Sequence, residues 1–259
     1  KIKNMILRRL GNKQKIAKEI QKHFPPHKVY VEPFFGAGGM FFNKPKAKYN
    51  IVNDLDSDVF NLFDILMNQK KELEKAFKIM PIHSDLLEHW KKNEETEPIK
   101  KALRFLLLSN FMPTGHQGTI DLNAENPKNH FFNKIDECFD FMFNVKFSNM
   151  DCNKFIDVTS KRSKDKVKDV LIYCDPPYLG TNDNYSNSFT DEQNNDLFDA
   201  LEKSKCNFAL SEFDHPFVLE QAKKRNLNVI VIGERHNLKN KRTEILVTNY
   251  ENRQPLLFT

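Results

Sequence analysis

Short apolar strands alternate with helical segments at both ends of this 259-residue chain, and that alternation restricts the fold more than any other feature. Near the amino terminus, Val29–Glu32 and Tyr49–Asn53 have the composition of buried strands, and Val59, Leu62 and Leu66 then recur at helical spacing. Strands that alternate with helices pair in parallel, because each helix returns the chain to the starting edge of the sheet. The pattern predicts an α/β fold with a mostly parallel sheet.

The same alternation returns in the last third of the chain. The apolar segments Val170–Cys174 and 207–211 are expected strands. The helix between them should begin at Thr190 or Asp191, because both residue types cap helices. These strands are expected to extend the parallel sheet.

The last two expected strands, 228–232 and 244–250, are joined by a polar link that is too short for a helical crossover. They should therefore pair antiparallel. The prediction for the whole sheet is a set of parallel strands with an antiparallel final strand.

A helical, loop-rich stretch separates the two alternating regions. Its helical pattern is interrupted by a segment rich in Pro, Gly and Asn, residues 113–129, which is too long for a simple turn. Long loops inside compact domains tend to be functional. We predict one domain made of residues 1–62 and 144–259, with an inserted, mainly helical lobe at residues 63–143.

Composition excludes several classes of protein. A net charge of +5, from 40 basic and 35 acidic residues, permits a nucleic acid partner without requiring one. No apolar run reaches the roughly 18 residues of a membrane helix, and no signal-peptide pattern is present, so we expect a cytoplasmic protein with no membrane partner. The four cysteines are widely spaced, which argues against zinc and disulfides.

A basic run at residues 161–168 precedes the expected strand Val170–Cys174. In a parallel sheet, segments that enter strands lie at the edge opposite the ligand crevice. We therefore interpret this run as a solvated surface loop. It is not a candidate for the functional site.

A glycine-rich turn follows the first strand, in the sequence Val-Glu-Pro-Phe-Phe-Gly-Ala-Gly-Gly at residues 31–39, and a helix is expected from Met40. Gly36 and Gly38 permit a sharp turn and the close approach of a ligand. The turn lacks the Lys-Ser/Thr ending of a phosphate-binding P-loop. Asp54 ends the next strand, where a carboxylate can accept hydrogen bonds from ribose hydroxyls. Together, the glycine-rich turn and Asp54 favour a nucleoside-binding site. The alternative interpretation is a tight turn without a ligand, followed by an aspartate that only caps a helix.

The segment Asp175-Pro176-Pro177-Tyr178 directly follows a buried strand, which places it at the ligand edge of the sheet. The two prolines restrict the backbone and remove two N–H donors. The turn then offers a carboxylate, a carbonyl oxygen and a flat aromatic face. Those groups suit an amino group on an aromatic ring. A simple Pro-Pro turn is the alternative interpretation.

With these motifs together, the chain resembles the Dam-type DNA adenine methyltransferases, the D12 class. The resemblance is clearest at residues 32–38, 53–58, 173–178 and 244–250, and the order of motifs is that of the α group of amino-methyltransferases. Gly11-Asn12-Lys13 is similar to the family's Gly-x-Lys cofactor segment, although Arg8 and Arg9 stand where the family often has an aromatic residue. The resemblance implies a Rossmann-like S-adenosylmethionine methyltransferase fold with an inserted target recognition lobe.

The family resemblance also implies the site residues. S-adenosyl-L-methionine is the implied cofactor, without a metal. The implied cofactor-binding residues are Lys13, Glu32, Pro33, Phe34, Gly36, Ala37, Gly38, Asp54, Asp151 and Asp175. The implied catalytic residues, which would receive the target adenine, are Asp175, Pro176, Pro177 and Tyr178.

Direct methyl transfer to a flipped-out adenine of double-stranded DNA is the expected reaction. A covalent nucleophile is not expected, because the sequence has no Pro-Cys dipeptide of the cytosine C5 type. The alternatives are transfer to RNA adenine or to cytosine N4, or a catalytically idle DNA-binding regulator. A cognate restriction endonuclease stays open as a partner, and we expect a monomer or weak dimer.

Two segments are candidates for DNA contacts. The link 233–243 carries Arg235, Lys239, Lys241 and Arg242, which suit phosphates, although a solvated hairpin is an equal alternative. In the lobe, His116 and Gln117 could read bases or be polar turn residues. Between residues 110 and 132 the only basic Lys or Arg is Lys128, so recognition of GATC is not predicted.

Overall fold

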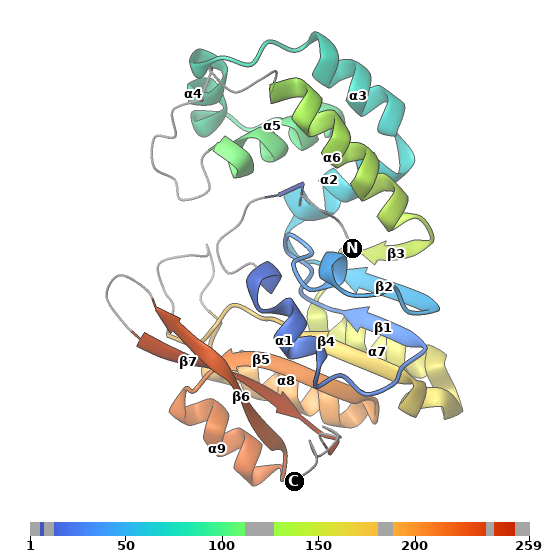
Figure 1. The fold of residues 1–259 in the computed structure, drawn as a ribbon, viewed down its shortest axis with the longest axis vertical. Coiled ribbons are helices and arrows are strands. Elements are labelled where there is room, and N and C mark those ends of the chain that lie inside the picture. Colours follow the sequence, from blue (N-terminus) through green and yellow to red (C-terminus); the bar gives the residue numbers. More distant parts are fainter. Residues whose placement is uncertain (1–5, 8–12, 112–126, 181–188, 237–240, 252–259) are drawn as a thin grey trace, which may run out of the picture.

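Seven strands form one sheet in the computed structural model, which describes residues 6–7, 13–111, 127–180, 189–236 and 241–251. Their order across the sheet is β3-β2-β1-β4-β5-β7-β6. The strands are β1 Val29–Glu32, β2 Tyr49–Asn53, β3 Val145–Ser148, β4 Val170–Cys174, β5 Asn207–Phe213, β6 Asn228–His236 and β7 Lys241–Thr248. Figure 1 shows the sheet below a group of helices.

The sheet confirms the predicted mostly parallel pairing. Strands β3, β2, β1, β4 and β5 pair in parallel, and β7 is antiparallel to both of its neighbours, β5 and β6. The antiparallel strand is thus the last along the chain, as predicted, but it lies inside the sheet. The hairpin turns β7 back between β5 and β6, so that β6 becomes the edge strand.

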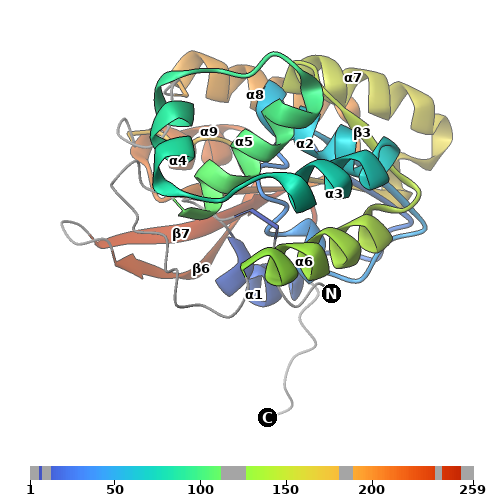
Figure 2. The same ribbon diagram turned by 90° about the horizontal axis from the view of Figure 1, so that it is seen from above.

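Helices cover both faces of the sheet. α7 (Cys152–Ser163), α8 (Asp191–Ser204) and α9 (Pro216–Lys224) lie on one face, and the short α1 (Ala17–Gln21) lies on the other (Figure 2). The buried side chains of α7–α9 pack against alternate residues of β1, β4, β5 and β7. α8 begins with a capping box at Thr190 and Gln193, which confirms the helix start predicted at Thr190 or Asp191.

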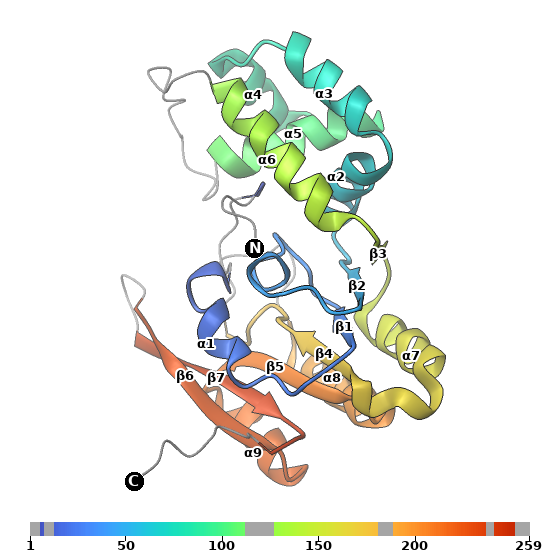
Figure 3. The same cartoon turned by 45° about the vertical axis from the view of Figure 1, so that its right-hand side comes forward.

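A group of helices stands beyond β2 and β3, as Figures 1 and 3 show. It consists of α3 (Lys70–Ile79), α4 (Ser84–Lys92), α5 (Pro98–Phe111) and α6 (Pro127–Met142). α2 (Ser57–Asn68) enters this group from the sheet, and it runs through the domain boundary predicted at residues 62 and 63. The division into two domains stays a prediction. None of the helices in the described ranges is long and apolar enough to cross a membrane.

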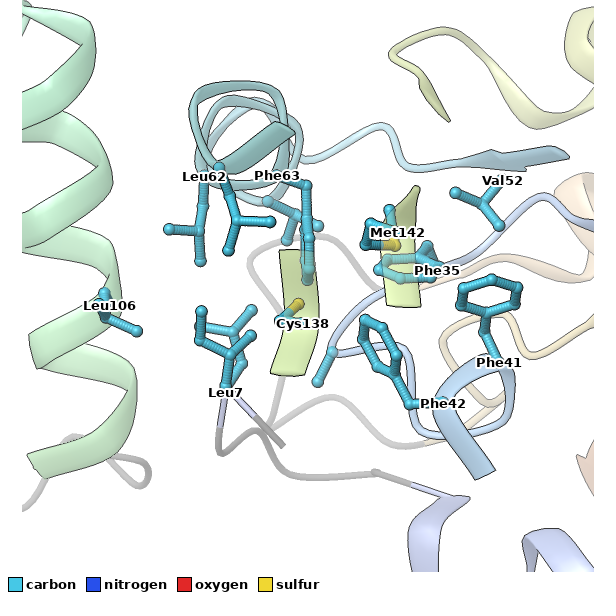
Figure 4. Close-up of a cluster of buried hydrophobic side chains, with 14 of the residues drawn as sticks. Leu7, Phe35, Phe41, Phe42, Val52, Leu62, Phe63, Leu106, Cys138 and Met142 are labelled. Atoms are coloured by element: carbon cyan, nitrogen blue, oxygen red, sulfur yellow. The ribbon is translucent and has the colours of Figure 1, made fainter. Parts of the chain in front are cut away.

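The core joins the sheet to the helical group. Phe35 and Phe42, from the segment after β1, lie beside Phe63 of α2 and Met142 of α6 (Figure 4). The Phe35 ring contacts the Phe63 ring edge-to-face, with centroids 5.0 Å apart. Buried aromatic pairs of this kind contribute about 0.5–1.5 kcal/mol beyond the burial of their surface. The glycine-rich segment is therefore held against the helical group by aromatic packing.

Two local predictions were wrong, and one strand was missed. The helix expected from Met40 is a single 3-10 turn, Phe41–Asn43, because Met40, Phe41 and Phe42 are all buried and Pro45 prevents continuation. The short strand β3 was not predicted. The basic run at 161–168 is the end of α7 followed by the 3-10 helix Lys164–Asp169, rather than a loop. It does precede β4, at the edge expected from the sequence.

Candidate functional site

The carboxyl ends of three adjacent parallel strands form one edge of the sheet. β1, β2 and β4 start in register, because Val29 lies opposite both Tyr49 and Val170. The strands then end at Glu32, Asn53 and Cys174, directly before the glycine-rich turn, Asp54 and Asp175. The structure thus brings the three motifs singled out in the sequence to the same edge.

The glycine-rich turn is tied to Asp54. The Gly36 N–H donates to Oδ2 of Asp54 at 2.5 Å, and the Asp56 N–H donates to Oδ1 at 2.9 Å. A carboxylate can accept about four hydrogen bonds, more than the two that these N–H groups donate. Asp54 is only partly buried. Its carboxylate therefore fixes the turn from a position that solvent can reach.

Gly36 and Gly38 differ in what surrounds them. Both have positive φ, +53° and +73°, which favours glycine. A Cβ at Gly38 would lie 2.4 Å from Cε2 of Phe42 and 2.8 Å from Cζ of Phe35, whereas a Cβ at Gly36 would meet nothing within 4 Å. Gly38 thus makes room for the aromatic core. Gly36 faces open space that a ligand can approach.

Asn53 links the ends of β1, β2 and β3. Its fully buried side chain donates to the carbonyls of Pro33 (3.1 Å) and Met150 (2.9 Å) and accepts from the Met150 N–H (3.1 Å). A buried amide with several satisfied hydrogen bonds rigidifies the loops that it joins. This side chain therefore positions the glycine-rich turn.

Glu32 is a buried carboxyl group beneath the turn. The Tyr30 hydroxyl donates to its Oε2 at 2.7 Å. Burial raises the pKa of Glu32 well above its usual value, and the nearby Asp175 and Asp54 charges act in the same direction, against Tyr30 and Lys44. Lys44 is buried too, with Nζ 4.1 Å from the Tyr30 ring centroid, and burial lowers its pKa to about 8.

The turn at 175–178 carries a charged cluster. Nζ of Lys13 lies 2.6 Å from Oδ1 of Asp175 and 3.5 Å from Oε1 of Glu244. The Tyr178 hydroxyl donates to the same Glu244 oxygen at 2.5 Å. The ammonium of Lys13 also lies 4.5 Å from the Tyr178 ring centroid, and Phe213 packs edge-to-face against that ring, with centroids 4.6 Å apart. Sequence reasoning had placed Lys13 near the cofactor; here it contacts the expected catalytic residues.

The Asp175 carboxyl group is subject to two opposing effects. Burial raises its pKa above the usual value, and the Lys13 ammonium acts against that rise. Burial also raises the pKa of the Tyr178 hydroxyl well above its usual value, as do the charges of Asp175 and Glu244. Tyr178 therefore stays protonated at neutral pH and remains a hydrogen-bond donor.

The other expected cofactor residues lie around the same edge. Pro33 and Ala37 are buried, and Phe34 is half-buried with its ring edge-to-face with Phe189, centroids 6.1 Å apart. Asp151 is exposed after β3, and its Oδ1 accepts from the N–H groups of Asn153 (3.0 Å) and Lys154 (3.1 Å). Asp151 thus caps the start of α7. Its predicted cofactor contact stays a prediction.

The predicted DNA-contact segments are only partly described. Arg235 lies in β6, and Lys241 and Arg242 lie in β7, because these strands extend further into the 233–243 link than expected. The guanidinium of Arg242 donates to the Gly180 carbonyl at 3.2 Å, which connects the hairpin to the segment that follows the 175–178 turn. The remaining candidates, Lys239, His116 and Gln117, lie outside the described residues.

Sequence reasoning missed two buried glutamates beside the 175–178 turn. Glu212 of β5 accepts from the Leu179 N–H, and Glu244 of β7 accepts from the Tyr178 hydroxyl. Both are essentially inaccessible to solvent, at 0% and 1% exposure. The sequence did contain a signal, because each glutamate lies inside or directly beside an apolar strand. Charged residues are almost never fully buried without a partner, so such a position indicates that a partner is close by. Within the described ranges, His, Cys, Asp and Glu side chains form no group of three suited to a metal ion.

Comparisons with known proteins agree with this arrangement. Residues 10–245 match the model of the family described as D12 class N6 adenine-specific DNA methyltransferase. The chain is 27% identical over 181 residues to DNA adenine methylase of Salmonella typhi, and 26% identical over 213 residues to DNA adenine methylase of Escherichia coli. The Salmonella match covers 65% of this chain and 62% of the relative, and the Escherichia match covers 74% and 73%. The chain thus spans about three fifths of the length of the first of these relatives.

A solved structure, the rRNA methyltransferase aviRa from Streptomyces viridochromogenes, aligns with a TM-score of 0.40 at 11% sequence identity. The alignment covers 90% of this chain and 84% of that protein.

Proposed function

Because the chain belongs to the D12 class N6 adenine-specific DNA methyltransferases, we propose that it transfers a methyl group from S-adenosylmethionine to the N6 amino group of adenine in duplex DNA. The observation that carries the proposal is the joint placement of the glycine-rich turn, Asp54 and the 175–178 turn at one edge of the sheet. Ligands of open α/β sheets bind at that edge.

The residues at this edge fit the proposed cofactor. Asp54 suits the ribose hydroxyls, and the open space at Gly36 permits backbone approach. The Asp175 carboxyl group, whose ionised form the Lys13 ammonium favours, suits a ligand that carries a positively charged sulfonium and an ammonium group. When bound, S-adenosylmethionine would supply an activated methyl group on a positively charged sulfur.

Asp175 and Pro176 would orient the target amino group. A flipped adenine presents two amino protons, which the Asp175 carboxylate and the Pro176 carbonyl can accept. These bonds increase electron density on the amino nitrogen and direct its lone pair. Positioning and electrostatics of this kind contribute most of the rate in such transfers.

Tyr178 and Lys13 would prepare the place of the base. The Tyr178 ring offers an aromatic face next to Asp175, but Lys13 already contacts both groups. An incoming amino group must therefore share or replace the contact between Lys13 and Asp175. Until then, the Lys13 ammonium favours the ionised form of the partly buried Asp175.

Covalent catalysis by the adjacent cysteine is not part of the proposal. Cys174 directly precedes Asp175, but its side chain is buried in β4. Burial raises the pKa of the Cys174 thiol well above its usual value. A thiol that stays protonated is a poor nucleophile.

We further propose that the lobe at 63–143 reads the DNA sequence and that the β6–β7 hairpin contacts phosphates. The hairpin carries basic residues beside the catalytic turn, and the Arg242 contact with Gly180 joins the two. The relatives named above are bacterial, and bacterial DNA lies in the cytoplasm, so we propose a cytoplasmic location for this protein too.

The experiment compares Asp175→Ala with Asp140→Ala, a matched change at an exposed aspartate of α6. Both proteins would be given labelled S-adenosylmethionine and unmethylated duplex DNA. We expect Asp175→Ala to remain folded and lose transfer, whereas Asp140→Ala keeps it. Methylation at the normal rate by Asp175→Ala would contradict the proposed role. An inactive but cofactor-binding wild-type protein would contradict the proposed DNA substrate.

A further inference from the structure

The turn that carries the proposed catalytic residues has fewer backbone donors than most turns. Pro176 and Pro177 have no N–H group, so two of the donors that normally stabilise a turn are missing. The first described hydrogen bond from a backbone N–H after the prolines comes from Leu179, and it goes to a side chain on another strand. A side chain on a neighbouring strand therefore contributes to holding the turn.

β5 extends beyond the end of β4 and provides the first support. Cys174, the last residue of β4, lies opposite Leu210, while β5 continues to Phe213. Glu212 lies in this extension and is fully buried. One of its oxygens accepts the Leu179 N–H at 3.0 Å, and the other accepts the Phe213 N–H at 2.7 Å. Glu212 thus ties the end of the turn to β5.

β7 provides the second support. Glu244 lies opposite Phe213 in the β5–β7 pairing and accepts the Tyr178 hydroxyl at 2.5 Å. Leu179 packs with the apolar residues under α7–α9. Side chains alternate between the two faces of a sheet along each strand. Glu212 is paired with Ile245, and the next pair is Phe213 with Glu244, so Glu212 and Glu244 point to opposite faces. The two glutamates therefore hold consecutive residues of the turn from opposite faces.

We propose that Glu212 and Glu244 are positioning residues, which fix the 175–179 turn so that Asp175 and Tyr178 face the target base. The inference rests on the proposed function for its catalytic consequence. Neither glutamate needs to touch cofactor or DNA. Each acts through a hydrogen bond to the turn, and an error of about 1 Å in such a site can reduce the rate about 100-fold.

Glu212→Gln tests the first support, and Glu220→Gln on the exposed face of α9 is its matched control. A glutamine has one acceptor oxygen, so one of the two N–H groups loses its partner. We expect amide exchange at Leu179 or Phe213 to accelerate about 10-fold or more, because a buried hydrogen bond is lost. We expect the single-turnover transfer rate to fall about 10- to 100-fold with cofactor affinity unchanged. The control should change neither quantity.

A double-mutant cycle with Tyr178→Phe and Glu244→Leu, each of which removes the hydrogen bond, tests the second support and does not depend on the stability of Glu212→Gln. If the two residues act through one hydrogen bond, the double variant loses no more rate than the more impaired single variant. Additive losses would overturn the role of Glu244. Unchanged exchange and rate in Glu212→Gln would overturn the role of Glu212. A wild-type protein that binds cofactor and transfers no methyl group would refute the proposed function alone, because exchange still reports whether the glutamates hold the turn.

Discussion

Replacing Gly38 by alanine should destabilise the protein much more than the same replacement at Gly36. The two glycines share the positive φ that an L-residue adopts at a cost of about 1–2 kcal/mol. They differ in space, because only at Gly38 would the new Cβ overlap the rings of Phe42 and Phe35, at 2.4 Å and 2.8 Å. The pair therefore separates backbone strain from overpacking.

The magnitudes follow from these two effects. Gly36→Ala has backbone strain alone, so we expect its free energy of unfolding to fall by about 1–2 kcal/mol. Gly38→Ala adds overpacking of a closely packed aromatic cluster, typically about 1–3 kcal/mol, which brings its total loss to about 2–5 kcal/mol. Adding Phe42→Leu removes the ring carbons nearest the new Cβ. After the loss of stability caused by Phe42→Leu alone is subtracted, the double variant should regain much of the stability that overpacking removes in Gly38→Ala.

The assay is reversible urea unfolding of the single and double variants, combined with cofactor binding. We expect Gly36→Ala to weaken cofactor binding with a small loss of stability, because Gly36 faces open space at the ligand edge. Gly38→Ala should show the larger loss of stability. Equal losses in the two variants, or no coupling between Gly38→Ala and Phe42→Leu, would refute the packing argument.

Three further predictions concern titration and DNA. Burial raises the pKa of Glu212 to about 8, so its contribution to stability is complete below the unfolded-state pKa near 4.3 and is lost as pH rises through 8. Between pH 5 and 9, the free energy of unfolding measured with urea should therefore fall less for Glu212→Gln than for the wild-type protein. An equal fall in the two proteins would contradict this. Lys44 has its pKa lowered to about 8 from 10.5, so stability should rise between those pH values, and Lys44→Met should abolish the rise. Neutralising Lys239, Lys241 and Arg242 should make the salt dependence of DNA binding shallower, by about 0.9 in the log–log slope per lost phosphate contact. An unchanged slope would count against the hairpin.

The parts predicted correctly from the sequence are those that depend on local chemistry. The apolar run Val170–Cys174 indicates a buried strand by itself, and its neighbours Asp175 to Tyr178 follow at its end. Thr190 can be recognised as a cap because its partner Gln193 is three residues away. The parallel pairing follows from the alternation of strands and helices.

The parts that were missed depend on partners far away in the sequence. The buried positions of Glu212 and Glu244 become intelligible only when Leu179 and Tyr178 are placed beside them. The helix expected after Met40 fails partly for a local reason, because Pro45 stops it after one 3-10 turn. Packing of its aromatic side chains into the core, which the sequence does not reveal, fixes that turn.

The chemical identity of the methylated nucleoside tests the central claim most directly. Unmethylated duplex DNA would be incubated with the protein and isotope-labelled S-adenosylmethionine, digested to nucleosides and analysed by mass spectrometry. We expect label in N6-methyladenine nucleoside and none in methylated cytosine, with the signal lost in Asp175→Ala. Label in N4-methylcytosine, or full labelling of adenine by Asp175→Ala, would contradict it.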